Sequence, residues 1–145
     1  LEYADVVWDI FTASNINSIK KVQRKSFHFI YNKHSRTDSV TELYAIAVLQ
    51  PLELRRRINM LKFLFNLSHE RFNLDKNSYI SRRPPPRYPS RTQNVMALGE
   101  HCCRVDMLKF SFFPRTVHDW NSLPNEDVTQ AEYALFVRKL YRPFS

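Results

Sequence analysis

Residues 52–67 constrain the fold of this chain most strongly, because apolar side chains would cover most of the circumference of a helix formed there. These side chains are Leu52, Leu54, Ile58, Met60, Leu61, Phe63, Leu64, Phe65 and Leu67. Pro51 suits the first helical position, where its missing amide proton costs nothing. The narrow polar stripe that remains consists of Arg55, Asn59, Lys62, Asn66 and His69. A helix this apolar is normally buried, so we predict that it is the central helix and that its phenylalanines belong to the core.

Three further segments carry helical patterns. Apolar residues recur at helical spacing from Ile16 to Ile30, after a cap at Ser14 or Asn15. A capping box at residues 39–42 predicts a short helix that ends near Val48. A second capping box at residues 129–132 predicts a last helix, whose final turn holds Arg138, Lys139 and Arg142. Those three cations complement the negative end of the helix dipole, which is sufficient to explain them.

Residues 105–113 favour β structure and are predicted to form one or two short strands closed by Pro114. Pro114 is also expected to begin a single helical turn through Trp120, whose ring joins Leu123 in a small satellite core. The predicted fold class is mainly α, with three to five helices, a small β element and a proline/arginine-rich linker. We expect a helical region at 1–70, a basic linker at 71–104 and a C-terminal module at 105–145.

The net charge of +8 is unevenly distributed along the chain. No acidic residue lies between Asp9 and Asp38, and on the helix predicted there the cations share the side opposite the apolar residues. They are Lys20, Lys21, Arg24 and Lys25, with His28 beside them. A further basic cluster, residues 55–57, is offset only in part by Glu53. Such a face is typical either of a helix that follows a nucleic-acid backbone or of an ordinary solvated helix surface.

The segment 82–91 is a second acid-free basic stretch, and it contains three consecutive prolines that enforce extended polyproline geometry. Its cations are Arg82, Arg83, Arg87 and Arg91. We interpret it as a semi-rigid strap able to lie along phosphates, with Tyr88 available to stack on a base. The alternatives are an exposed linker and a polyproline ligand for a partner domain.

Several classes of site are not indicated by the sequence. Cys102 and Cys103 are adjacent, which does not give the spacing that lets two thiolates bind one zinc ion, and we expect free thiols in a reducing compartment. Gly99 is the single glycine, so no glycine-rich phosphate loop exists. No nucleophile motif and no apolar run long enough to span a membrane occurs. Because the chain begins with Leu1 inside an apolar run, we expect a fragment of a longer protein.

Two spaced phrases resemble a known family. The first is Leu-Glu-Tyr-Ala-Asp-Val-Val-Trp at residues 1–8, and the second is Phe-Phe-Pro-Arg-Thr-Val-His-Asp-Trp-Asn-Ser-Leu-Pro at residues 112–124. Residues 43–57 also fit the pattern. Together they resemble the region after the catalytic palm in reverse transcriptases of non-LTR retrotransposons (LINE-like, jockey-type). The resemblance covers nearly the whole chain and implies that the first phrase opens a thumb helix, that residues 1–70 are thumb-like, and that a basic linker precedes the second phrase.

The resemblance implies a non-catalytic role for this chain. Polymerase chemistry in that family needs paired aspartates that hold two magnesium ions, and Val6 follows Asp5 where the second carboxylate would stand. We therefore expect no catalytic residue, no metal ligand and no cofactor here, with Asp5 solvated and magnesium confined to a palm outside this sequence. The zinc knuckle that ends some relatives is also missing.

The expected partners are the RNA or DNA backbone and the palm and endonuclease regions of the same polyprotein, with no membrane and no small-molecule substrate, in the nucleus or cytoplasm of the cell. In the second phrase Arg115 is the side chain expected to face a phosphate. The alternative is a structural or protein-interaction module of the polyprotein that never contacts nucleic acid.

Overall fold

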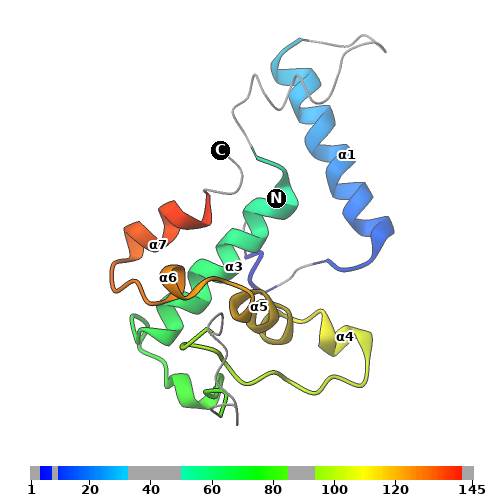
Figure 1. Cartoon of the computed structure of the whole chain (residues 1–145). Helices are drawn as coiled ribbons and strands as arrows, with labels where there is room; N and C mark the ends of the chain where they lie inside the picture. The colour runs from blue at the N-terminus through cyan, green and yellow to red at the C-terminus, as the bar shows by residue number, and fades with distance from the viewer. Residues whose placement is uncertain (1–3, 8–9, 33–49, 85–93, 142–145) are drawn as a thin grey trace. The chain divides into compact units, whose positions relative to one another are not determined.

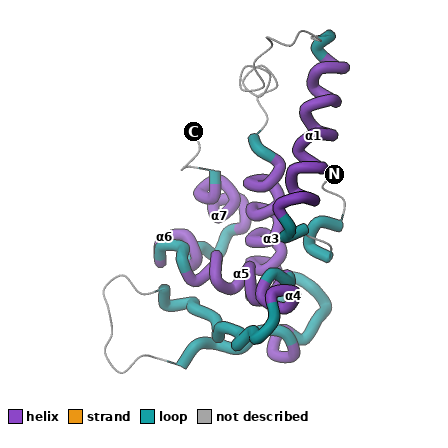
Figure 2. Tube along the Cα trace, turned by 90° about the vertical axis from the view of Figure 1, so that its right-hand side faces the viewer, coloured by secondary structure: helices purple, strands orange, loops and turns teal. Residues whose placement is uncertain are grey.

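The computed structural model describes residues 4–7, 10–32, 50–84 and 94–141, which are coloured in Figure 1. Their elements are α1 (Ala13–Ile30), α3 (Leu52–Ser68), the 3-10 helix η1 (Lys76–Ser78), α4 (Asp106–Lys109), α5 (Phe112–Asn121), α6 (Asn125–Val128) and α7 (Tyr133–Leu140). Figure 2 shows helices and loops only among these residues. The prediction of a mainly α fold is confirmed. The helix predicted at 39–48 lies outside the described residues.

The chain divides into two compact units, residues 1–56 and residues 57–145, called here the N-terminal and the C-terminal unit. Helix α3 begins in the N-terminal unit and continues into the C-terminal unit. The three-part division at residues 70 and 104 stays a prediction.

In the N-terminal unit, α1 forms where the periodicity predicts a helix. Thr12, rather than Ser14 or Asn15, occupies the N-cap position, and it makes no side-chain capping bond. The helix ends where Asn32 adopts a left-handed backbone conformation (φ 49°) and its amide donates to the carbonyl of Phe29, a conformation that asparagine tolerates better than most residues.

The face of α1 that becomes buried differs from the one predicted. Gln23 and Phe27 are buried, whereas Phe29 and Ile30 remain exposed. The expected apolar stripe is therefore only partly covered. The reason is geometric, because Phe29 lies about 160° around the helix from Phe27 at 100° per residue, counted the short way round. The turn at residues 4–7 precedes α1, and Asp5 within it is buried rather than solvated.

In the C-terminal unit, α3 forms the centre of the core, as predicted. Its buried apolar side chains there are Ile58, Met60, Leu61, Leu64, Phe65 and Leu67. Helices α5, α6 and α7 lie around this part of α3 (Figure 1). The ring of Phe65 stacks on that of Phe136 in α7 at 4.3 Å between centroids and lies 6.5 Å from the ring of Trp120 in α5. Trp120, predicted to belong to a satellite core, is thus part of the main core.

The C-terminus of α3 is closed by two hydrogen bonds of a Schellman motif. The amide of Arg71 donates to the carbonyl of Asn66, and the amide of Glu70 donates to that of Leu67. Glu70 takes the left-handed conformation (φ 54°) that glycine would adopt without strain. The guanidinium of Arg71 then lies over the Phe65 ring, at 5.6 Å from its centroid, and donates to the carbonyl of Ala131. This residue therefore joins the end of α3 to the segment that leads into α7.

The prediction of strands at 105–113 is wrong. Val105 has extended backbone angles but serves as the N-cap of α4, and α5 already begins at Phe112. Pro114 occupies the third position of α5, where its missing amide proton leaves no helical hydrogen bond unmade. The helix is consequently longer than the single turn predicted. The described residues contain one isolated antiparallel bridge, between Arg82 and Leu98.

The capping box predicted at residues 129–132 is also wrong. Thr129 is the C-cap of α6, where its hydroxyl donates to the carbonyl of Asn125 at 2.8 Å. Helix α7 starts at Tyr133, with Glu132 as an N-cap that makes no side-chain bond. Arg138 and Lys139 lie in its last turn, as predicted, and Arg142 lies outside the described residues. A serine or threonine three residues before a glutamate can therefore end one helix as well as begin another.

The core position of Leu64 gives a direct test of this packing. Leu64 is fully buried in α3, whereas Leu135 in α7 is 43% exposed. Leu64→Ala should lower the free energy of unfolding by about 2–5 kcal/mol, because it removes buried methyl groups and leaves a cavity. Leu135→Ala makes the same chemical change at an exposed helical site and should cost less than about 1 kcal/mol. Urea denaturation measures both, and equal losses for the two variants would contradict the packing described.

Candidate nucleic-acid interface

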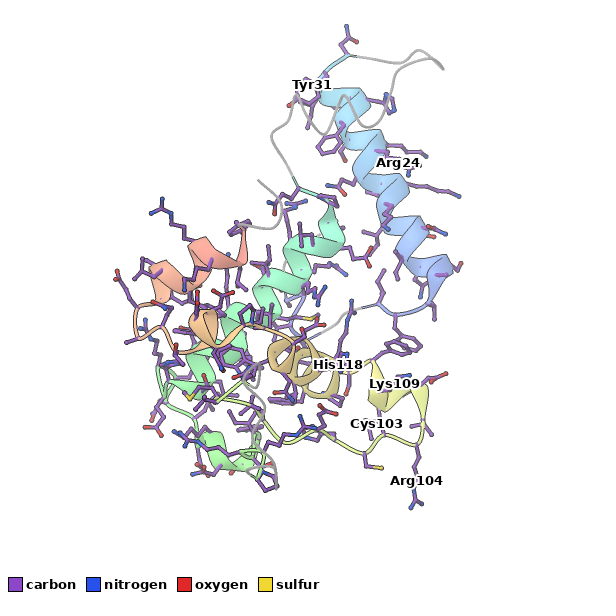
Figure 3. The ribbon with its side chains drawn as sticks, in the orientation of Figure 1. Arg24, Tyr31, Cys103, Arg104, Lys109 and His118 are labelled. Atoms are coloured by element: carbon purple, nitrogen blue, oxygen red, sulfur yellow. The ribbon has the colours of Figure 1, made fainter. Side chains whose placement is uncertain are left out.

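The basic face of α1 carries four of the nine cations predicted to contact phosphates, namely Lys20, Lys21, Arg24 and Lys25. Lys21, Arg24 and Lys25 are exposed, and Figure 3 shows the side chain of Arg24 extending from the helix. None of these three cations has a carboxylate partner among the described residues. Lys20 differs, because its ammonium lies 3.1 Å from the carboxylate of Glu53. Of the four lysine and arginine residues predicted on this helix to contact phosphates, three therefore have no carboxylate partner among the described residues.

The three cations lie close together on one side of the helix. Lys21 and Lys25 are four residues apart and Lys21 and Arg24 are three apart, spacings that place their Cβ atoms roughly 5–6 Å from each other. Like charges at such spacing destabilise a helix by a few tenths of a kcal/mol per pair. A polyanion lying against this side would relieve that repulsion. The arrangement can bind phosphates as a group of neighbouring point charges without reading sequence.

The predicted strap is described only at its beginning. Arg82 is exposed and has no carboxylate partner among the described residues. Arg83 lies 3.6 Å from the carboxylate of Glu100, which the pairing of residues 81–83 with residues 97–99 brings near. Arg87 and Arg91 lie outside the described residues, and so does Tyr88. Although the segment contains no acidic residue in sequence, the fold therefore brings the carboxylate of Glu100 close to one of its arginines.

Arg115 is half-buried in α5 and already has an interaction partner in the chain. Its contact with a phosphate stays a prediction. The nearby cations that sequence analysis did not single out, Arg104 and Lys109, are exposed around α4 and are labelled in Figure 3.

The arginine cluster at residues 55–57 has structural partners. Arg56 is buried, and Nε of Arg55 donates to the carbonyl of Gln50 at 3.1 Å. Arg57 makes two parallel bonds to the carboxylate of Asp119, both 2.8 Å long. This bidentate geometry joins α3 to α5 within the C-terminal unit. The cluster therefore serves packing and is not part of the candidate interface.

A cavity of about 360 Å³ in the C-terminal unit is lined by Lys76, Ile80, Ser81, Arg82, Met96 and Leu98, among others. Apart from Arg82, sequence analysis did not indicate this cavity, because its walls come from separate segments spread between Ser68 and Trp120. Among the described residues, its lining includes two cations and no carboxylate. The ammonium of Lys76 is paired with Glu70 at 2.6 Å, whereas Arg82 has no carboxylate partner in the part of the chain that the structure describes.

Asparagine side chains hold one wall of this cavity in place. Asn121 exchanges two hydrogen bonds with the backbone of Leu98, each 2.9 Å long. Asn94 donates to the carbonyl of Trp120, and the indole Nε1 of Trp120 donates to the carbonyl of Met96, both at 3.0 Å. These bonds satisfy backbone groups that have no partner in a helix or sheet. The segment 94–98 is thereby fixed against the C-terminal end of α5.

Gly99 allows the backbone at residue 99 to approach Ser81, which lines the cavity. Its amide donates to the carbonyl of Ser81 at 2.7 Å. A Cβ atom at this position would lie 2.5 Å from Oγ of Ser81, well inside van der Waals contact. The single glycine of the chain is therefore used for backbone proximity beside the cavity and not for a phosphate loop.

The described ranges hold no group of three or more histidine, cysteine, aspartate or glutamate side chains placed to bind a metal ion. Cys102 and Cys103 are free thiols. Among the helices described, none combines the length and the apolar character that crossing a membrane requires.

Comparison with known proteins matched no family model, no curated protein and no solved structure. The resemblance to retrotransposon polymerases therefore depends on the spaced sequence phrases alone.

Asp75, which caps η1 beside the cavity, gives a test of the local geometry. Hydrogen bonds from the Ser78 hydroxyl and from the Asn77 amide hold the pKa of Asp75 below its ordinary value of 3.8. Because these bonds favour the charged form in the folded state, the stability they contribute is present above the ordinary pKa. It is lost as the pH falls through the lowered one.

Ser78→Ala removes the larger of these causes and should raise the pKa of Asp75 toward its ordinary value. Carboxyl ¹³C NMR of Asp75 through a pH titration measures the change. Ser81→Ala is the control, because Ser81 makes no bond to Asp75 in the structure. Identical midpoints in the wild type and the Ser78→Ala variant would contradict the capping geometry.

Proposed function

We propose that this chain is a non-catalytic, nucleic-acid-binding part of an RNA-directed DNA polymerase of the non-LTR retrotransposon class. In this proposal it holds the backbone of the primer–template or element RNA during target-primed reverse transcription. A palm domain outside this sequence carries out the chemistry, with its magnesium ions. The spaced phrases at residues 1–8, 43–57 and 112–124 support the family assignment.

The observation that carries the binding proposal is that Lys21, Arg24 and Lys25 are exposed and have no carboxylate partner among the described residues. Salt bridges neutralise other cations of the chain, including Lys20, Arg57 and Arg83. These three remain exposed side by side on α1, which contains no acidic residue. Lysine and arginine side chains of this kind displace the counterions condensed on a nucleic-acid backbone, and the released ions drive binding.

A second candidate function is supported by the apolar side chains that α1 exposes. Val22 is 50%, Phe29 81% and Ile30 66% exposed. In this alternative the helix is a protein-interaction surface, and its cations dock on acidic surfaces of the same polyprotein. Nucleic-acid binding would then be incidental and insensitive to single cations.

A salt titration of RNA affinity tests the proposal. For the wild type, log K should fall linearly with log salt concentration. Each of Lys21→Gln, Arg24→Gln and Lys25→Gln should reduce the slope by about 0.7 for single strands or about 0.9 for duplexes. Arg138→Gln, which removes an exposed cation at the end of α7, should leave the slope unchanged. Fluorescence anisotropy with a labelled RNA, and circular dichroism to verify folding, provide the measurements.

Glu53→Gln should change RNA affinity in the opposite direction in the same salt titration. It releases Lys20 from its ion pair and should increase both the affinity and the slope. If the α1 variants bind RNA as the wild type does, while Phe29→Ala abolishes binding to the rest of the polyprotein, the interaction-module function replaces the one proposed.

A further inference from the structure

The cavity of the C-terminal unit combines two kinds of surface. Ile80 and Leu98 are buried apolar residues, and Met96 adds a polarizable thioether. The basic residues Arg82 and Lys76 line the same space, together with the hydroxyl-bearing residues Ser68 and Ser81. At about 360 Å³ the cavity falls within the range of small-molecule sites. Its ligand should therefore have an apolar part and an anionic part.

The anionic part is best supplied by a phosphate. Arg82 has no carboxylate partner among the described residues, and its planar fork of donors matches two phosphate oxygens at once. Lys76 is engaged by Glu70, but an ammonium has three donor hydrogens and one ion pair leaves two. Among the lining residues that the structure describes, no carboxylate is present to repel an anion.

The apolar part is best supplied by a flat ring. The Met96 sulfur makes favourable contacts with aromatic rings, and the aliphatic side chains of Ile80 and Leu98 provide further contact area. Trp120 does not serve as a stacking platform, because its ring is fully buried and its Nε1 is bonded to the carbonyl of Met96. It instead fixes the backbone that presents Met96.

We propose that this cavity holds one unpaired nucleotide of the bound strand, with the base against Ile80, Met96 and Leu98 and a phosphate on Arg82. The inference depends on the proposed nucleic-acid function and names the subsite for a single nucleotide. Proteins that bind single strands commonly take up a splayed base in this way, with an apolar or aromatic contact and a cation at the backbone. Lys76, Ser81 and Met96 join the candidate residues on this basis.

The experiment observes the three methionine methyl groups of the whole chain by ¹³C NMR. Met96 lines the cavity, whereas buried Met60 and exposed Met107 do not and act as internal references. The probes are adenosine and uridine 5′-monophosphate, the corresponding nucleosides, inorganic phosphate and a single-stranded tetranucleotide. The mononucleotides and the tetranucleotide should shift Met96 alone. The nucleosides and inorganic phosphate should bind at least tenfold more weakly.

Two variants test the charge requirement. Arg82→Gln should weaken mononucleotide binding about tenfold or more. Asn77→Asp places a carboxylate of the same size in the exposed part of the lining and should weaken it similarly. Arg138→Gln is the matched control and should bind as the wild type does. The spectra of Met60 and Met107 show whether each variant remains folded.

The outcomes separate this subsite from the broader function. If the α1 variants reduce oligonucleotide affinity but Met96 never shifts, the proposed function stands and the subsite is wrong. A Met96 shift with mononucleotides and no oligonucleotide binding at low salt would overturn both, leaving a site for small phosphate esters. Equal binding of nucleosides and nucleotides would overturn the role of Arg82.

Discussion

Three helices of the C-terminal unit meet in one aromatic cluster, and its centre is the ring of Phe65. Phe136 from α7 stacks on one side, Trp120 from α5 lies nearby, and Arg71 covers the ring with its guanidinium. The Phe65, Trp120 and Phe136 rings are fully buried, and aromatic pairs in such geometry add to the large area they remove from water. Because Nε1 of Trp120 also donates to the carbonyl of Met96, the cluster fixes the position of the backbone at Met96, which lines the cavity.

Ion pairing decides which cations of the chain are available to a polyanion. Arg57 is committed to Asp119 and Lys139 to Asp127, so they contribute to packing within the C-terminal unit. Exposed pairs such as Lys20 with Glu53 are worth at most about 1 kcal/mol and can be exchanged for a phosphate contact. Cations such as Arg24, which have no carboxylate partner among the described residues, need no such exchange. The number of cations in the sequence therefore overstates how many are available to a polyanion, and the candidate interface consists of those without an ion pair in the described ranges.

The parts of the fold that sequence analysis predicted are those with strong local patterns. Helices α1 and α3 are long enough for their apolar periodicity to be clear, and burial of Phe65 follows from that pattern. The failures occur at short elements and at details of longer ones. Residues 105–113 favour strands by composition, but α4 has a single turn and too little pattern to identify, and the buried face of α1 differs from the predicted one. Thr129 matched a capping box and ended α6 instead. The cavity and the Lys20–Glu53 and Arg83–Glu100 pairs depend on contacts between distant segments, which no local pattern encodes.

The proposed function depends on contact between phosphates and the α1 cations that have no carboxylate partner among the described residues. The most direct measurement is the ¹H–¹⁵N NMR signal of the Arg24 Nε–H group during a titration of the whole chain with single-stranded RNA at low salt. If Arg24 meets a phosphate, this signal should shift and broaden in step with RNA binding, while that of Arg57, held by Asp119, should stay in place. RNA binding that leaves the Arg24 signal unmoved would contradict that contact.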